Sequence, residues 1–225
     1  MVTQKAVVWD LDGVIVDSGE AHNASWSMMA RDFGVHYDPD HDFRTIFGRH
    51  NTDIITSLWN VTDEARITEM TDSKEGYFRK EAATLKALPG VVELMAALRM
   101  RGWKQAIGSS APMKNIELLL SATGTGGYID AIASGDDVSR GKPDPQVFLM
   151  AFERLGVAPR YGVVIEDAPA GVRAGVRAGA AVLAVTNTQA RQVLIEAGAH
   201  KVVESLAGVT VNDLDELVAS RSIFS

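Results

Sequence analysis

The residues best suited to chemistry in this chain are acidic pairs that follow short apolar runs. Asp10 and Asp12 follow the run Ala-Val-Val-Trp, and Glu166 and Asp167 follow Gly-Val-Val-Ile. Residues at i and i+2 of a strand share a face, so Asp10 and Asp12 can point the same way before the turn that Gly13 permits. Carboxylates gathered in this manner suit acid–base or nucleophilic chemistry, and they also suit the binding of a hard cation such as Mg²⁺.

Simpler interpretations of these acids stay open at this point. Asp and Gly are common turn residues, and adjacent acids can lie solvated in an exposed loop. A calcium loop is excluded, because counting from Asp10 places Ile15 at the position that requires glycine. Glu166 and Asp167 would repel each other unless a cation lay between them. A shared sheet edge for all these acids would therefore favour magnesium.

Two further segments contain groups suited to binding an anion. Ser109 and Ser110 precede Pro112, which is favoured at the start of a helix, and the free N–H groups of a helix N-terminus bind anions. By themselves these serines are better explained as helix caps. Lys142 stands between Gly141 and two prolines that would fix the backbone and aim the ammonium at an anion. The segment is not a P-loop, because Pro follows Lys142 where Ser or Thr is required.

Strands and helices are predicted to alternate around these residues. The apolar runs of strand length are Ala6–Leu11, Gln105–Ser109, Ala131–Gly135, Gly162–Asp167 and Ala180–Thr186. Helical spacing follows the later runs over Pro112–Ser121, Pro145–Leu155 and Ala170–Ala178. This pattern predicts a parallel sheet covered on both faces, in which ligands bind at the carboxyl ends of the strands. The polar residues gather at those ends, including Asp136 and Asp137 after the third run.

The stretch from Ser18 to Lys86 breaks the alternation, because its apolar residues have helical spacing. One helix face, for example, contains Ile54, Ile55, Leu58 and Trp59. Leu88-Pro89-Gly90 ends the helical stretch and marks the return to the sheet. The predicted fold is therefore α/β, a three-layer Rossmann-like parallel sheet core with an inserted all-helical cap domain. The core takes residues 1–17 and 88–225, and the cap takes residues 18–87.

The composition excludes several classes of site and partner. Cysteine is absent, which rules out disulfides, thiolate zinc sites and a cysteine nucleophile. A formal net charge of −7 without a basic stripe argues against a nucleic-acid partner. No window approaches the roughly 18 uncharged apolar residues of a membrane span, and the N-terminus lacks the features of a signal peptide. We therefore expect a cytoplasmic monomer, without a membrane partner, that needs a metal ion or a few well-placed cations to handle any anionic substrate.

Taken in order, four segments resemble the sequence motifs of the haloacid dehalogenase-like superfamily. They are DLDGVIVDS at 10–18, GSS at 108–110, GKPDP at 141–145 and IEDAPAGVRA at 165–174. Their order, their spacing and the helical insert after the first motif extend the resemblance over nearly the whole chain. The resemblance implies that a carboxylate, that of Asp10, is the nucleophile and forms an aspartyl-phosphate. It implies that Asp12 is the general acid/base, which protonates the leaving oxygen and later activates water.

The same resemblance implies the binding groups of the site. Ser109, Ser110 and Lys142 would hold the phosphoryl oxygens. Mg²⁺ would be bound by Asp10, by the backbone carbonyl of Asp12 and by Asp167, with Glu166 supporting the site directly or through water. Phosphoryl transfer requires such compensation of negative charge, since an anionic nucleophile must approach an anionic phosphoryl group. The implied partner is a small phosphorylated metabolite.

The motifs are most similar to a group that holds phosphoglycolate-type phosphatases, small sugar-phosphate phosphatases and β-phosphoglucomutase. His22 resembles a mutase histidine that assists the acid/base residue. The lysine and arginine of the mutase cap loop, however, correspond here to Phe47 and Asn51, while Arg49 and His50 are shifted relative to that pattern. We therefore predict magnesium-dependent hydrolysis of a small phosphomonoester such as a sugar phosphate. A sugar-phosphate mutase is the alternative, and a non-catalytic phosphate-binding module is disfavoured because both motif aspartates are present.

Overall fold

The fold is built on one six-stranded sheet, as the computed structural model shows for residues 3–46 and 49–222. The strands are β1 (Ala6–Trp9), β2 (Lys104–Gly108), β3 (Ala131–Ala133), β4 (Gly162–Glu166), β5 (Ala181–Val185) and β6 (Lys201–Val203). Their order in the sheet is β3-β2-β1-β4-β5-β6, and all pairs are parallel. In the central strand, Val8 lies opposite Ala106 on one side and Val164 on the other.

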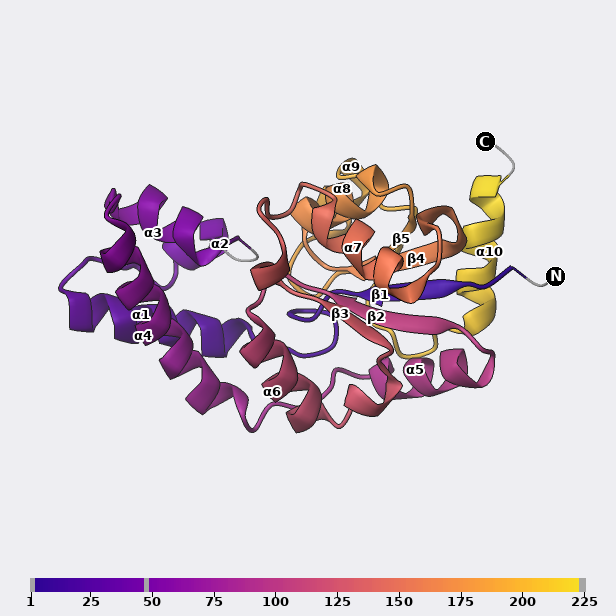
Figure 1. Ribbon diagram of the computed structural model, residues 1–225, viewed down its shortest axis with the longest axis horizontal. Helices are drawn as coiled ribbons and strands as arrows, with labels where there is room; N and C mark the ends of the chain where they lie inside the picture. The colour runs from indigo at the N-terminus through magenta and orange to yellow at the C-terminus, as the bar shows by residue number, and fades with distance from the viewer. Residues whose placement is uncertain (1–2, 47–48, 223–225) are drawn as a thin grey trace.

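Helices cover both faces of the sheet (Figure 1). One face packs against α5 (Val91–Met100), α6 (Met113–Thr123) and α10 (Val211–Ser222), and the other against α7 (Gln146–Leu155), α8 (Pro169–Arg177) and α9 (Arg191–Glu196). Val7 and Trp9 point into the first layer and Val8 into the second, as the alternation of side chains along a strand requires. Single 3-10 turns lie in the connections at Gly126–Tyr128, Gly135–Asp137 and Pro159–Tyr161. This arrangement confirms the predicted α/β fold with a three-layer core.

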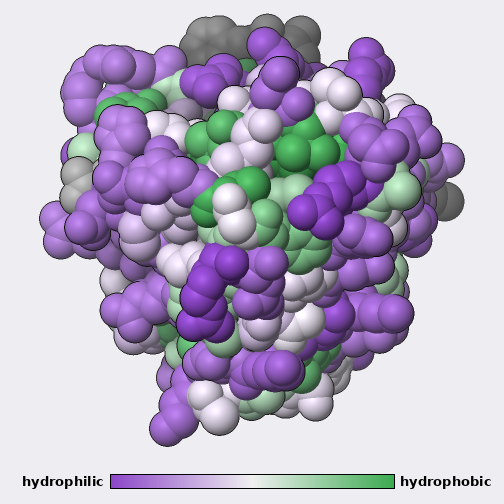
Figure 2. Space-filling model, turned by 90° about the vertical axis from the view of Figure 1, so that its left-hand side faces the viewer, coloured by the Kyte–Doolittle hydropathy of each residue, from purple (hydrophilic) through white to green (hydrophobic). Residues whose placement is uncertain are grey.

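Four more helices lie beyond the carboxyl ends of the strands (Figure 1). We call α1 (Gly19–Phe33), α2 (Asp42–Ile46), α3 (Asn51–Trp59) and α4 (Glu64–Ala82) the cap helices. They pack around an apolar cluster of their own, centred on Trp26, Met29, Ile55 and Met70. Viewed from this end, the surface is mainly hydrophilic, and its hydrophobic residues form small patches (Figure 2). The apolar side chains of the cap helices are therefore mostly turned inward, as expected of amphipathic helices.

All five predicted strands are present, and a sixth was missed. β6 is only three residues long and half-buried at the edge of the sheet, so its Lys-Val-Val sequence gives too short a pattern to predict a strand. The stretch predicted to be helical between β1 and α5 contains the cap helices, which confirms the helical insert. Within residues 3–46 and 49–222, no helix combines the length and the apolar composition of a membrane span.

Candidate active site

Three buried acids meet where the strand order of the sheet reverses. From β1 the chain proceeds outward to β2 and β3, then returns to the other side of β1 as β4, so a crevice opens at the carboxyl ends of β1 and β4. Asp10 follows β1 directly, Glu166 ends β4, and Asp167 is the next residue. Carboxylate oxygens of these three residues lie within 4.8 Å of one another. The parallel sheet therefore brings together acids that are more than 150 positions apart in the sequence.

Lys142 supplies the positive charge among these acids. Its Nζ lies 2.5 Å from Oδ1 of Asp10 and 2.8 Å from Oε1 of Glu166. The side chain is 5% exposed, and its ammonium lies 4.6 Å from the centre of the Phe148 ring. Although burial opposes ionisation, the charges of Asp10 and Glu166 raise the pKa of Lys142. Lys142 is therefore a fixed cation beside Asp10.

The positive charge of Lys142 does not fully offset the mutual repulsion of the three carboxylates. Burial raises the pKa of Asp10 to about 7 against the charge of Lys142, with Glu166 and Asp12 adding to the rise. Burial and the charge of Glu166 also raise the pKa of Asp167 well above its ordinary value. A cation between these oxygens would favour the ionised form of both aspartates. The donor set is all oxygen, which suits a hard cation such as Mg²⁺.

Two glycines leave room for the acidic side chains. A Cβ on Gly13, whose φ is +81°, would lie 1.9 Å from Oδ2 of Asp167, and a Cβ on Gly171 would lie 1.5 Å from Oε1 of Glu166. Oε2 of Glu166 accepts hydrogen bonds from the N–H groups of Asp167 at 2.7 Å and Ala168 at 2.8 Å. Thr188 donates to Oδ2 of Asp167 at 2.6 Å. Each acid is thus held by backbone or hydroxyl contacts, and larger residues at the two glycines would displace it.

Asp12 connects this cluster to the cap helices. Its Oδ1 accepts a hydrogen bond from Ser18 Oγ at 2.5 Å and lies 3.3 Å from His22 Nε2 on α1. Nδ1 of His22 lies 3.0 Å from Nζ of Lys74 on α4, and the imidazole stacks on Phe78 with the ring centres 4.0 Å apart. These contacts fit a neutral His22 that has its proton on Nε2, and burial together with the charge of Lys74 lowers its pKa. Burial alone would raise the pKa of Asp12, but His22, Ser18 and Lys74 together lower it.

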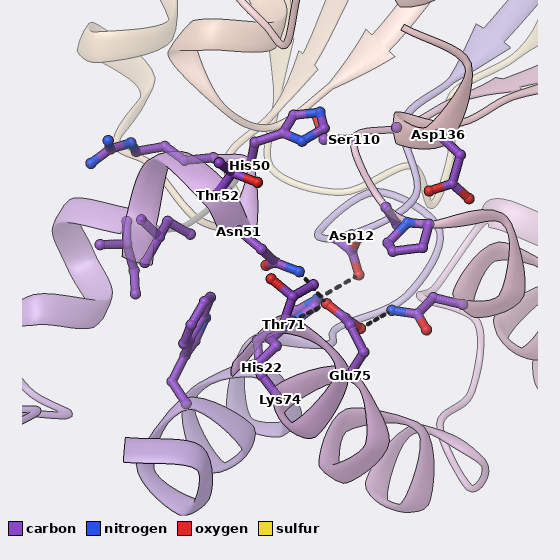
Figure 3. A pocket seen from close by; sticks show the side chains of 18 of the residues that line it. Asp12, His22, His50, Asn51, Thr52, Thr71, Lys74, Glu75, Ser110 and Asp136 are labelled. Carbon is purple, nitrogen blue, oxygen red and sulfur yellow. Dashed lines mark hydrogen bonds and ion pairs between the residues drawn. The ribbon is translucent and has the colours of Figure 1, made fainter. Parts of the chain in front are cut away.

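Another buried acid, Glu75, continues the network across the cap (Figure 3). Its Oε1 accepts hydrogen bonds from Lys74 Nζ and from Asn51 Nδ2, each at 2.7 Å. Its Oε2 accepts from Asn115 on α6, which also accepts a hydrogen bond from Arg79 at 3.2 Å. Asn51 begins α3, whereas Asn115 belongs to the helix that covers the sheet. Glu75 therefore joins two cap helices to the core.

Two adjoining cavities are lined by these groups. The smaller, of about 40 Å³, is lined by residues that include Asp10, Ser109, Lys142 and Asp167, and it has room for a small ion with water. The larger, of about 240 Å³, lies between the cap helices and the core and is lined by residues that include His22, His50, Lys74, Glu75 and Asn115. Asp12 and Ser110 line both cavities. The arrangement separates a charged reaction chamber from a chamber that can hold the rest of a substrate.

The cap-loop residues that the sequence suggested as substrate contacts differ in their surroundings. His50 lines the larger cavity and packs on Gly141, where an added Cβ would lie 2.7 Å from its Cδ2. Its buried Nε2 has no hydrogen-bond partner within residues 3–46 and 49–222. Arg49 also lines this cavity, but its guanidinium donates to the carbonyl of Asp53 and to Ser57 on α3. The remaining position of the mutase pattern, Phe47, lies outside the described residues.

Comparison with known proteins agrees with this geometry. Residues 4–179 match the family described as haloacid dehalogenase-like hydrolase. The chain belongs to this family of hydrolases. It is 33% identical to Hexitol phosphatase A of Escherichia coli over 80% of this chain and 82% of that protein. It is 30% identical to Beta-phosphoglucomutase of Bacillus subtilis over 94% of both.

A solved structure shows the same fold. The crystal structure of β-phosphoglucomutase from Clostridium difficile superposes on this hydrolase with a TM-score of 0.87. The superposition covers 98% of this chain and 100% of the other, at 23% sequence identity. It therefore extends through the cap helices as well as the sheet.

Several residues at the site of this hydrolase were missed in the sequence. Lys74 had a usable signal, because Met70, Lys74 and Phe78 are spaced four apart and all are buried, so a lysine interrupts the apolar stripe of α4. Thr188 had no such sequence signal, since it lies in a loop after β5. Gly171 had no distinct signal, because it lies in a four-residue repeat with Gly175 and Gly179, and this spacing is also typical of helix–sheet packing. Gly175 does pack against Val164 and Val182 of the sheet, but Gly171 instead makes room for Glu166.

Proposed function

We propose that this hydrolase cleaves a small phosphomonoester, such as a sugar phosphate, with Mg²⁺ and through an aspartyl-phosphate on Asp10. The observation that carries the proposal is the position of Asp10. Its carboxylate contacts Lys142 at 2.5 Å inside a cluster of acids suited to a hard cation. Asp12, two residues further on, lines both the cluster and the larger cavity. A phosphoryl group in the small cavity and its alcohol in the large one would place the ester bond beside Asp12.

In the first step, an oxygen of Asp10 attacks phosphorus as the ester bond between phosphorus and the alcohol oxygen breaks. Lys142 sits where it can neutralise charge on the phosphoryl oxygens, and Ser109 and Ser110 line the same space. The leaving oxygen takes the proton of Asp12, so the alcohol departs neutral. The anionic Asp12 then takes a proton from water, which attacks the aspartyl-phosphate and releases phosphate.

His22 and Lys74 position Asp12 for both proton transfers. His22 Nε2 lies 3.3 Å from Oδ1 of Asp12, and Lys74 holds the other ring nitrogen at 3.0 Å. A donor on Oδ1 stabilises the carboxylate left after the first transfer and leaves the second oxygen of Asp12 for the substrate. These different roles of the two Asp12 oxygens support Asp12, rather than Asp10, as the acid/base residue.

Mg²⁺ would be held by Asp10, by Asp167 and by the backbone carbonyl of Asp12, with Glu166 as support. When bound, it would offset the negative charge that builds up as one anion attacks another. The raised pKa values of Asp10 and Asp167 and the all-oxygen donor set favour this assignment.

Further proposals concern the domain boundaries, the cellular location and the oligomeric state. We propose residues 18–87 as a cap domain over a core of residues 1–17 and 88–225, with the larger cavity at their boundary. A cytoplasmic monomer that takes a small phosphorylated metabolite is consistent with the acidic composition and the mainly hydrophilic cap end (Figure 2). Size-exclusion chromatography with light scattering would test the oligomeric state.

A panel of phosphorylated metabolites tests the proposed activity. Phosphate release should require added Mg²⁺ and should stop when a chelator removes it. Sugar and sugar-alcohol monophosphates should be preferred to nucleotides, whose bulkier base fits a cavity of about 240 Å³ less well. Phosphate release that persists at full rate with chelator, or that is absent from every ester tested, would contradict the proposal.

A sugar-phosphate mutase is the second candidate, favoured by the contact of His22 with Asp12 and by the mutase relative of the chain. A mutase must exclude water from the aspartyl-phosphate and retain a bisphosphate for return transfer, which requires cap cations that grip a distal phosphate. Asn51 is instead hydrogen-bonded to Glu75, and Arg49, which precedes α3, is hydrogen-bonded to residues of that helix. We therefore expect β-glucose 1-phosphate with a bisphosphate primer to give little glucose 6-phosphate. Efficient conversion without phosphate release, lost in Arg49→Ala, would favour the mutase.

A further inference from the structure

The larger cavity contains a carboxylate that the proposed chemistry does not use. Glu75 lies on the wall of this cavity, only 4% exposed, and reaches neither the acid cluster nor Asp12 in any contact among the described residues. Although burial opposes its ionisation, the charge of Lys74 and the hydrogen bonds from Lys74, Asn115 and Asn51 lower its pKa. A buried carboxylate so placed is anionic, and whatever alcohol enters the cavity must meet it.

The hydrogen bonds of Glu75 leave capacity for a ligand. An ionised carboxylate offers about four lone-pair positions, and Lys74, Asn51 and Asn115 occupy three of them. The remaining position can accept a hydrogen bond from a hydroxyl group of a bound substrate. It cannot accept a phosphate or carboxylate oxygen, which has no proton to donate at neutral pH.

The charges around the cavity also disfavour a second anion. Besides the acid/base residue Asp12, the lining contains the carboxylates of the buried Glu75 and the exposed Asp136, against the cations of Lys74 and Arg49. Lys74 is already paired with Glu75 at 2.7 Å, and the guanidinium of Arg49, which precedes α3, is hydrogen-bonded to Asp53 and Ser57 of that helix. Around the buried Glu75, where water is largely excluded, repulsion between like charges is stronger than in water.

We propose that Glu75 selects the alcohol part of the substrate: it favours a polyhydroxylated chain with a single phosphate and excludes a second anionic group. This proposal rests on the proposed phosphatase activity and adds the class of ester to it. Glu75 acts as a specificity-determining residue, because it would touch the distal part of the substrate and not the reacting atoms.

The test compares a hexitol 6-phosphate with the 1,6-bisphosphate of the same hexitol. For each enzyme, kcat/KM of the bisphosphate is divided by kcat/KM of the monophosphate, so any loss of folded enzyme cancels. The wild-type ratio should be about 0.1 or lower, and Glu75→Gln should raise it by about 10-fold, because the amide keeps the shape but removes the charge. Asp72→Asn is the matched control, since it removes one charge from the exposed side of the same helix and should leave the ratio unchanged.

A second variant guards against failure of Glu75→Gln to fold. Thr71 lines the same cavity one turn before Glu75, so Thr71→Lys adds a cation while keeping the buried Lys74–Glu75 pair, and it should also raise the ratio. An unchanged ratio in both variants, beside normal turnover of the monophosphate, would overturn the assignment of Glu75 alone. Absence of turnover with every phosphomonoester would overturn the proposed function and this inference with it.

Discussion

Acids follow both β1 and β3 at the same edge of the sheet, but the two groups have opposite environments. Asp10, after β1, is buried against Asp167 and Glu166, and burial raises its pKa to about 7. Asp137, after β3, is part-exposed, and hydrogen bonds from Arg154 and Ser134 lower its pKa. β1 and β4 meet where the strand order reverses, whereas β3 is an edge strand whose following turn is held by Arg154 of α7. A position at a strand end is therefore not sufficient for a site, and adjacency to the reversal point decides which acids converge.

Asp10→Asn should have the largest effect, because an amide cannot replace the carboxylate as nucleophile. We expect phosphate release from an aryl phosphate to fall by about 10⁴-fold or more. Circular dichroism and thermal unfolding should show an intact fold. Comparable turnover at matched purity would show that the buried acids do not differ in function from those after β3.

Asp12→Asn should slow turnover of an alkyl phosphate by about 10²–10⁴-fold, the usual contribution of a positioned proton donor. An activated aryl ester needs no proton on its leaving group, so phosphorylation of Asp10 should persist with that substrate. Rapid quenching and intact-mass spectrometry would detect the phosphoenzyme. Loss of the phosphoenzyme with unchanged Mg²⁺ binding would assign Asp12 to the nucleophilic step instead.

Asp167→Asn should weaken Mg²⁺ binding by about 10- to 100-fold, by analogy with other changes to metal sites. The Mg²⁺ concentration at half-maximal turnover gives one measurement. The second is the Mg²⁺-dependent rise in melting temperature, which is independent of activity and should shrink in the variant. An equal shift in wild type and variant would mean that Mg²⁺ binds elsewhere.

Asp137→Asn should have the smallest effect, a loss of about 1 kcal/mol in the free energy of unfolding, as for a partly exposed capping acid. The folded-state pKa of Asp137 lies below its unfolded value. Its stabilisation is therefore fully present above the unfolded pKa and is lost as the pH falls through the folded one. Urea unfolding should show a constant gap between wild type and variant at neutral pH that closes in acid. Turnover should change by about 2-fold at most, and a larger loss would bring β3 into the site.

The sequence was sufficient to predict five of the six described strands, because those strands lie in short, mainly apolar runs separated by helical patterns. It also placed Asp10, Glu166 and Asp167 near one another, since the carboxyl ends of parallel strands share an edge, whereas Lys142 was assigned to this site only through the resemblance to the family motifs. It could not separate Asp137 from these acids, because the order of strands is a long-range property that short patterns do not contain. The network of Lys74, Glu75 and Asn115 depends on how α4 packs against α6, and that packing angle leaves no trace in either helix alone.

The two cavities share few lining residues, and this affects how substitutions can alter the specificity of the enzyme. Asp12 and Ser110 line both chambers, while every other lining residue described belongs to one chamber only. Substitutions on α3 or α4 can thus redesign the space for the alcohol without touching the groups around phosphorus. A library restricted to Asn51 and Thr71, which keeps Lys74 and its ion-pair partner Glu75 in place, would explore new esters on an unaltered catalytic apparatus. Chemistry and selectivity in this molecule can then evolve as separate modules joined through one aspartate and one serine.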